Sequence, residues 1–176
     1  MEQRGAGARG LFRAVVAGYA WLLSQILVLS VVILIFPVSL QIFSRYTELI
    51  PSYIWTEEMA RLLFIWTIMI GAMIGVRESQ HFEVDVWPPL SPRLDAAIRL
   101  FSRIAVLVVA IAFLVAGWEF TRFAFNRISE MAEMPLWLIH VAWPLAGFTW
   151  IMFLGEQMYD DLRLILGDTA RERSRS

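Results

Sequence analysis

The chain has 176 residues, of which 59% are hydrophobic and 18% are charged, and its net charge at pH 7 is −1. Ordinary soluble domains are about 45–50% apolar and about 25% charged, so this composition indicates an integral membrane protein. The small net charge argues against a nucleic-acid-binding protein. The lack of cysteine excludes disulfides, thiolate metal sites and redox dithiols.

The first predicted transmembrane helix covers about residues 14–43. Arginines precede an uncharged run from Ala14 to Phe36, which is longer than the roughly 7–15 apolar residues of a signal peptide. We therefore expect a retained span rather than a cleaved leader. Because about 20 residues suffice to cross a bilayer, this helix should tilt or bend at Pro37.

The second predicted span covers about residues 56–76, and its uncharged part is too short to cross a bilayer alone. Glu57, Glu58 and Arg61 must therefore lie at or slightly below the interface. Helical spacing brings both acids within reach of Arg61. One interpretation is helix capping, with Arg61 extending to the headgroups. The other is that a neighbouring protein satisfies these charges.

Two motifs follow the charged cluster. Gly71 and Gly75 form a G-x-x-x-G pattern, which lets another helix approach closely and marks the face of this span that we expect to pack. The loop at 77–92 then places His81 and Asp85 on one side of an extended segment. A metal site there is disfavoured, since no second histidine is nearby.

The third predicted span covers about residues 104–125 and draws Glu119 and Arg122 towards the bilayer. Ser91-Pro92 predicts a helix start, and the residues after it form an amphipathic lead-in with Arg99 and Arg103 on its polar face. We expect this interfacial lead-in to lie along the membrane surface before the chain turns inward.

The fourth predicted span covers about residues 135–155 and contains His140 and Pro144. An ionisable residue inside a membrane is a functional candidate, although a neutral imidazole bonded to a neighbouring helix is the commoner outcome. The polar segment at 167–176 is predicted to be disordered.

The whole chain, residues 1–176, is thus predicted to be a single membrane domain of the all-α class. Arginines are concentrated in the N-terminal, 77–103 and C-terminal segments, which predicts that both termini lie in the cytoplasm (N-in, C-in). A bis-haem bundle would need four axial histidines, and a self-sufficient transporter would usually have paired broken helices with polar groups at mid-membrane. We therefore predict no catalytic, cofactor or metal site, and a subunit without a reaction centre of its own.

Residues 55–71 read W-x-E-E-x-A-R-x-x-F-x-W-x-x-x-x-G, and residues 77–85 read R-x-x-x-H-x-x-V-D. With the fourth-span stretch MPLWLIHVAWPLAG, these motifs resemble the small membrane subunit of tripartite ATP-independent periplasmic (TRAP) transporters. The resemblance covers nearly the whole chain. It implies a bacterial inner-membrane protein that steadies a large multi-span transport subunit. It further implies uptake of an organic acid that a periplasmic binding protein delivers, driven by an ion gradient.

On this resemblance the expected partners are the large subunit, the periplasmic substrate-binding protein and membrane lipid, with no cofactor and no nucleic acid. The candidate interface residues are Trp55, Glu57, Glu58, Arg61, Gly71, Gly75, Arg77, His81 and Asp85. The alternative is a self-contained four-helix membrane protein, such as an assembly factor or a small channel.

Overall fold

The computed structural model describes the backbone of residues 2–47, 54–78, 92–129 and 133–173, and the side chains of residues 10–47, 55–78, 98–129 and 133–158. Four described segments are long and apolar enough to cross a membrane, which confirms the predicted all-α, four-span class. The helices are α1 (Glu2–Tyr46), α2 (Ile54–Glu78), α3 (Pro92–Ala124), α4 (Trp137–His140) and α5 (Ala142–Arg173). The spans are Gly10–Tyr46, Trp55–Glu78, Ile98–Ala124 and Trp137–Met158.

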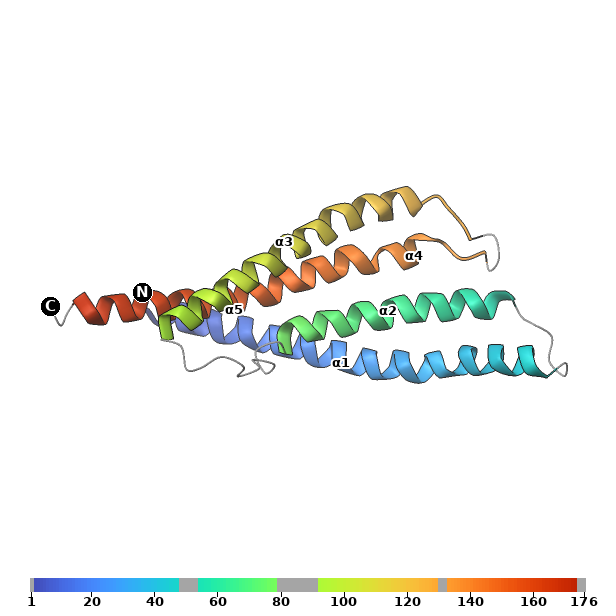
Figure 1. Cartoon of the computed structure of the whole chain (residues 1–176), viewed down its shortest axis with the longest axis horizontal. Helices are drawn as coiled ribbons and strands as arrows, with labels where there is room; N and C mark the ends of the chain where they lie inside the picture. Colours follow the sequence, from blue (N-terminus) through green and yellow to red (C-terminus); the bar gives the residue numbers. More distant parts are fainter. Residues whose placement is uncertain (1, 48–53, 79–91, 130–132, 174–176) are drawn as a thin grey trace.

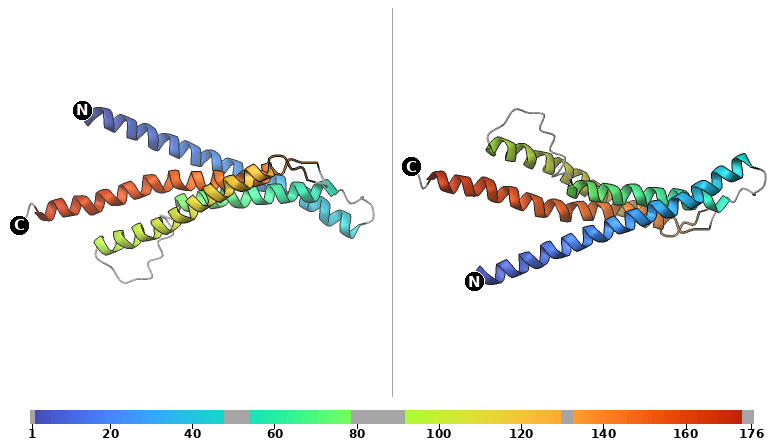
Figure 2. Two further views of the ribbon diagram at one scale, coloured as in Figure 1. Left: turned by 90° about the horizontal axis from the view of Figure 1, so that it is seen from above. Right: turned by 90° about the horizontal axis from the view of Figure 1, so that it is seen from below.

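The spans form an open row: α3 packs beside α4 and α5, α5 beside α2, and α2 beside α1 (Figure 1). Both termini lie at the same end of this row, which we call the terminal end, and the opposite end is the distal end (Figure 1). Towards the terminal end α1 and α5 spread apart (Figure 2). Which end faces the cytoplasm remains a prediction from the arginine distribution.

The first helix is longer than predicted and runs through Pro37 without interruption. A proline inside a helix removes one backbone hydrogen bond and often bends the axis. Here Pro37 is buried and belongs to the stripe of α1 that faces the rest of the chain. On the same stripe, Thr67 Oγ1 donates a hydrogen bond of 3.1 Å to Ser30 Oγ, which joins α2 to α1.

The predicted turn between the lead-in and the third span is absent, because α3 is one helix from Pro92 to Ala124. Arg103, on the polar face of the lead-in, contacts α5. Its Nη1 donates a hydrogen bond of 2.8 Å to the Gln157 carbonyl. This contact favours a straight path along α5 over a path on the membrane surface. At the other terminus, α5 stays helical to Arg173, which extends it into the segment at 167–176 that was predicted to be disordered.

The fourth span is divided into α4 and α5 at Val141, close to Pro144. Proline has no N–H to donate to the carbonyl four residues earlier, at His140. The interruption is small, since Val141 keeps helical angles (φ −64°, ψ −19°) and accepts a bond of 3.2 Å from Leu145 N. His140 is half-buried, and its ring stacks 6.2 Å from that of Phe120. His140 thus contacts the neighbouring helix α3 through ring stacking on Phe120.

Apolar side chains fill the space between the spans. The buried cluster includes Leu23 of α1, Ile70 and Met73 of α2, and Phe153 of α5. Two glycines allow α3 and α5 to approach closely: a Cβ on Gly117 would lie 2.7 Å from Pro144 N, and one on Gly147 would lie 2.6 Å from Ala110 O. Neither position can hold a side chain without moving backbone.

Candidate functional site

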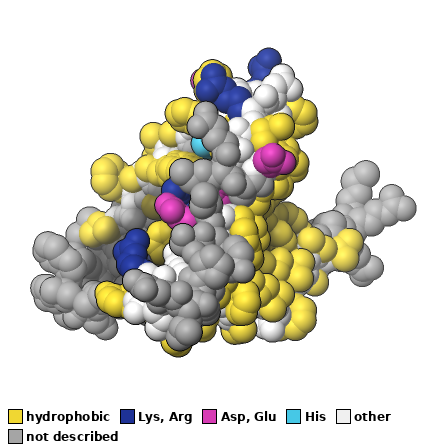
Figure 3. Space-filling model, turned by 90° about the vertical axis from the view of Figure 1, so that its right-hand side faces the viewer, with side chains coloured by type: hydrophobic (Ala, Val, Ile, Leu, Met, Phe, Trp, Pro, Cys, Tyr) yellow, Lys and Arg dark blue, Asp and Glu magenta, His cyan; other side chains and the backbone are white. Residues whose placement is uncertain are grey.

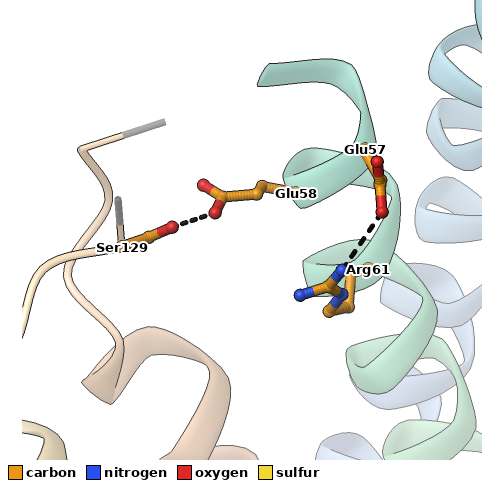
Figure 4. A network of polar contacts seen from close by, with 4 residues as sticks. All are labelled: Glu57, Glu58, Arg61 and Ser129. Carbon is orange, nitrogen blue, oxygen red and sulfur yellow. Dashed lines mark hydrogen bonds and ion pairs between the residues drawn. The ribbon is translucent and has the colours of Figure 1, made fainter. Parts of the chain in front are cut away.

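The distal end of α2 carries the charged motif, and the structure separates its members. Glu57 and Arg61 form an ion pair of 3.3 Å, with side chains 63% and 57% exposed (Figure 4). Glu58 is only 8% exposed and points the other way, towards the chain between α3 and α4 (Figure 4). Successive helical residues point about 100° apart, so the adjacent glutamates lie on different faces of α2, one exposed and one buried.

Glu58 is held inside the chain. The Ser129 hydroxyl donates a hydrogen bond to Glu58 Oε1, while Oε2 is buried and has no hydrogen-bond partner among the described residues. A buried polar atom without a partner is costly, so the Ser129 contact is important for keeping this carboxylate in place.

Backbone hydrogen bonds hold the segment that contains Ser129. Ser129 N donates to Met134 O at 2.8 Å, and Leu136 N donates to Arg127 O at 3.0 Å. Glu133 takes a positive φ of 53°, an uncommon angle for a residue other than glycine that lets the chain reverse here. These bonds join the described parts of the connection between α3 and α4, residues 125–129 and 133–136, and Glu58 links the first of them to α2.

One line of residues runs along the outward side of α2, and we call it the α2 line: Glu57, Arg61, Phe64, Ile68, Gly71 and Gly75. The spacing of three and four residues places them on one face. Phe64 and Ile68 are 54% and 50% exposed. Apart from the backbone of α2 itself and the glycines' chain neighbours, no described atom lies within 4 Å of a Cβ built on Gly71 or Gly75, so no other described helix packs closely on the face that the G-x-x-x-G motif marks.

Arg77, at the terminal end of α2, is an internal tie between helices. Its Nη1 donates a hydrogen bond of 2.5 Å to the Val16 carbonyl of α1, and its guanidinium lies 5.5 Å from the centre of the Phe153 ring of α5. Gln157 Nε2 donates to the carbonyls of Val76 and Arg77 at 3.3 and 3.4 Å. It thereby serves the last carbonyls of α2, which lack helical partners.

The remaining candidates differ in exposure. Trp55 is 45% exposed at the start of α2, while His81 and Asp85 lie outside the described residues.

The described part of the chain has no group of three or more His, Cys, Asp or Glu side chains that could hold a metal ion. Seen from the distal end, charged side chains of both signs are scattered among apolar ones (Figure 3).

Sequence reasoning missed several residues that join the helices, among them Ser129, Gln157, Trp66 and Trp150. Trp66 Nε1 donates to Leu138 O at 2.9 Å, and Trp150 Nε1 donates to Ala72 O at 3.1 Å. A tryptophan in the middle of a span was a usable signal, because a buried indole N–H needs an acceptor. Ser129 and Gln157 have no such signal in the sequence.

These features define an integral membrane protein of four spanning helices, tied together by side chains near both ends and packed with apolar residues between them. Comparison with known families is consistent with that class. Residues 34–164 match the family model described as "Tripartite ATP-independent periplasmic transporters, DctQ component". The chain belongs to this family and is a small permease subunit of the TRAP type, a family of transporter membrane subunits.

Individual relatives agree with the family. The sialic acid TRAP transporter small permease protein SiaQ of Vibrio cholerae is 30% identical over 131 residues, which cover 72% of this chain and 73% of that protein. The C4-dicarboxylate TRAP transporter small permease protein DctQ of Rhodobacter capsulatus is 33% identical over 111 residues, covering 59% of this chain and 48% of that protein.

A third similarity is to a much longer protein. The sialic acid TRAP transporter permease protein SiaT of Haemophilus influenzae is 33% identical over 78 residues, which are 44% of this chain but only 12% of that protein. With the four spans, family membership confirms the predicted location in the bacterial inner membrane.

Proposed function

We propose that this small permease subunit scaffolds a large multi-span subunit of a TRAP transporter. The large subunit would carry an organic acid inward, driven by an ion gradient, after a periplasmic binding protein delivers the acid. The orientation required is N-in, C-in, as the arginine distribution predicts. The substrate class follows the relatives, whose names specify sialic acid and C4-dicarboxylates.

The observation that carries the scaffold role is the packed apolar interior. Met73 and Phe153 are among the most fully buried side chains, and they lie in one cluster with Leu23 and Ile70 from three different helices. A solute crossing this chain alone would need polar groups near the middle of the membrane to replace its hydration. The described interior is instead mainly apolar, and its buried polar side chains Ser30 and Thr149 are engaged in hydrogen bonds within and between the helices.

The partner is proposed to be a larger membrane protein for two reasons. The segment shared with the Haemophilus influenzae permease forms a small part of a long polypeptide there, so a similar segment is covalently joined to a larger permease in that relative. In addition, the α2 line presents an exposed ion pair, two bulky apolar side chains and an open glycine pair on one helix face. We place the contact with the large subunit on this line, at Glu57, Arg61, Gly71 and Gly75.

The test is capture from native membranes. A tagged form of the chain is solubilised in mild detergent, and the proteins that co-purify at comparable amounts are identified by mass spectrometry. The expected partner is an integral membrane protein with many more spans than this chain. Recovery of the tagged chain without any such protein, from membranes that transport the acid, would contradict the scaffold role.

A further inference from the structure

A cavity of about 600 Å³ lies between α1, α2 and α5 at the terminal end, where α1 and α5 spread apart (Figure 2). Its volume is within the roughly 300–1,000 Å³ of small-molecule sites. Four charged side chains line it: Arg13 from α1, Arg77 and Glu78 from α2, and Glu156 from α5. The walls thus offer two cations and two anions around one opening at the membrane boundary.

Three of the four charged side chains, Arg13, Arg77 and Glu156, have described contacts, and all four line the cavity. Arg13 Nε lies 3.6 Å from Glu156 Oε1, and the two side chains are 59% and 25% exposed. Arg77 is oriented by the Val16 carbonyl on one side and the Phe153 ring on the other. That arrangement uses one of the five N–H donors of its guanidinium in the described contacts.

The part of the cavity further from the chain termini is lined mainly by apolar side chains. Trp21 lines it and is 65% exposed, and Ile74 lines it from α2. Trp21 lies eight residues after Arg13, about 12 Å further along α1 at 1.5 Å per residue. A ligand that fits both parts has a charged head at the level of Arg13 and a hydrocarbon chain that passes Trp21.

The spreading of α1 and α5 explains why this space is not closed by protein. Near the cavity α1 reaches α5 through the long side chain of Tyr19, whose hydroxyl lies 2.9 Å from Thr149 Oγ1. Because Thr149 already donates to Leu145 O at 2.8 Å, the Tyr19 hydroxyl is the donor. Beyond this contact, towards the termini, the backbones separate.

We propose that the cavity binds the headgroup of a bilayer phospholipid that carries both a phosphate and a protonated primary amine, the phosphatidylethanolamine type. The phosphate accepts hydrogen bonds from Arg13 and Arg77, as guanidinium groups bind phosphate well. The ammonium donates to Glu78 and Glu156, and its place beside the carbonyl end of α2 is electrostatically favourable.

Other common headgroups fit less well. Phosphatidylglycerol has a net negative charge and no amine, so it would leave Glu78 and Glu156 facing an anion. Phosphatidylcholine has a cation without N–H donors, so it cannot hydrogen-bond to the carboxylates. The two carboxylates therefore give selectivity for the primary amine, while the two guanidinium groups hold the phosphate.

The experiment is native mass spectrometry of the full chain, purified in detergent and offered equal amounts of phosphatidylethanolamine, phosphatidylglycerol and phosphatidylcholine. We expect one tightly held phosphatidylethanolamine, preferred about tenfold, which corresponds to one charge-assisted hydrogen bond. In the double variant Glu78→Gln with Glu156→Gln, the cavity keeps two cations, so the preference should reverse towards phosphatidylglycerol. Such a reversal is a gain of binding that a misfolded variant could not show.

Two controls complete the design. Arg61→Gln, at the distal end, should retain the preference for phosphatidylethanolamine. Soluble glycerophosphoethanolamine, offered at the concentration of the lipid, should fail to displace it, because it lacks the chain that contacts Trp21. Equal retention of the three lipids, an unchanged preference in the double variant, or displacement by the soluble headgroup would overturn the proposal. The measurement needs no partner protein, so its result is independent of the scaffold role.

Discussion

Ser129, between α3 and α4, donates a hydrogen bond to the buried carboxylate of Glu58 in the first turns of α2 (Figure 4). The neighbouring Glu57 faces outward and pairs with Arg61. One E-E dipeptide thus supplies an internal tie and an exposed ion pair. This division of roles makes the two glutamates a matched pair for mutagenesis.

Glu58→Ala should destabilise the chain far more than Glu57→Ala. Loss of a buried hydrogen bond to a charged group costs about 1.5–3 kcal/mol, whereas an exposed ion pair contributes about 0–1 kcal/mol. The measurement is the denaturant midpoint of each variant in one detergent. A double-mutant cycle with Ser129→Ala should show coupling, because both substitutions remove the same contact. Equal stability of the two glutamate variants would contradict the internal role of Glu58.

Gly147 and Gly75 form a second matched pair for mutagenesis. A methyl group on Gly147 would meet Ala110 O at 2.6 Å, so Gly147→Ala should force α3 and α5 apart and cost about 1–3 kcal/mol. Gly75→Ala enters open space and should be neutral or stabilising by about 0.4–1 kcal/mol, because alanine restricts the unfolded chain more than glycine does. Thermal unfolding of the purified chain tests both, and a neutral Gly147→Ala would contradict the tight crossing.

The α2 line gives a prediction about assembly rather than stability. Gly75→Leu should leave the isolated chain folded but reduce co-purification of the large subunit, since a bulky side chain keeps a second helix away. Gly18→Leu on α1 is the control, because Gly18 is equally open within the chain. A photo-crosslinking residue in place of Ile68 should form an adduct with the large subunit, and one in place of Val28 should not. Equal loss of the partner with both leucine variants would place the contact elsewhere.

Arg77 should be important for stability although it is charged and near the membrane boundary. Arg77→Gln removes the bond to the Val16 carbonyl and the contact with the Phe153 ring, at a cost of about 1.5–3 kcal/mol. Arg45→Gln, at an exposed position near the end of α1, should cost less than about 0.5 kcal/mol. Unfolding of the two variants in the same detergent checks this difference, and a mild Arg77→Gln would show that the tie between α1 and α2 lies elsewhere.

Much of the fold could be predicted from the sequence because a helix needs about 20 mainly apolar residues to cross the bilayer. The short uncharged part of α2 predicts that Glu57, Glu58 and Arg61 lie near the membrane interface, and in the structure they lie in the first turns of the span Trp55–Glu78. The different directions of Glu57 and Glu58 also follow from helical geometry, which turns successive side chains by about 100°. What could not be predicted is the partner of Glu58, since Ser129 lies in a connection whose shape depends on the packing of three helices.

The glycines that form the close helix crossing could likewise not be predicted from the sequence. The G-x-x-x-G spacing drew attention to Gly71 and Gly75, but the tight crossing within the chain uses Gly117 and Gly147, which have no such spacing. A single glycine on each of two helices becomes significant only once the helices are placed against each other. The turn predicted before the third span is absent for a related reason: Arg103 donates a hydrogen bond to a carbonyl of α5, a contact that depends on how α3 and α5 are placed.

Reconstitution into liposomes tests the central claim most directly. The chain, its co-purified large partner, and both together are placed in separate vesicles with an imposed ion gradient, and uptake of a labelled organic acid is measured with the purified periplasmic binding protein outside. The scaffold role predicts uptake with both subunits present and none with this chain alone. Uptake or ion conduction by this chain alone would contradict it and favour a self-contained membrane protein.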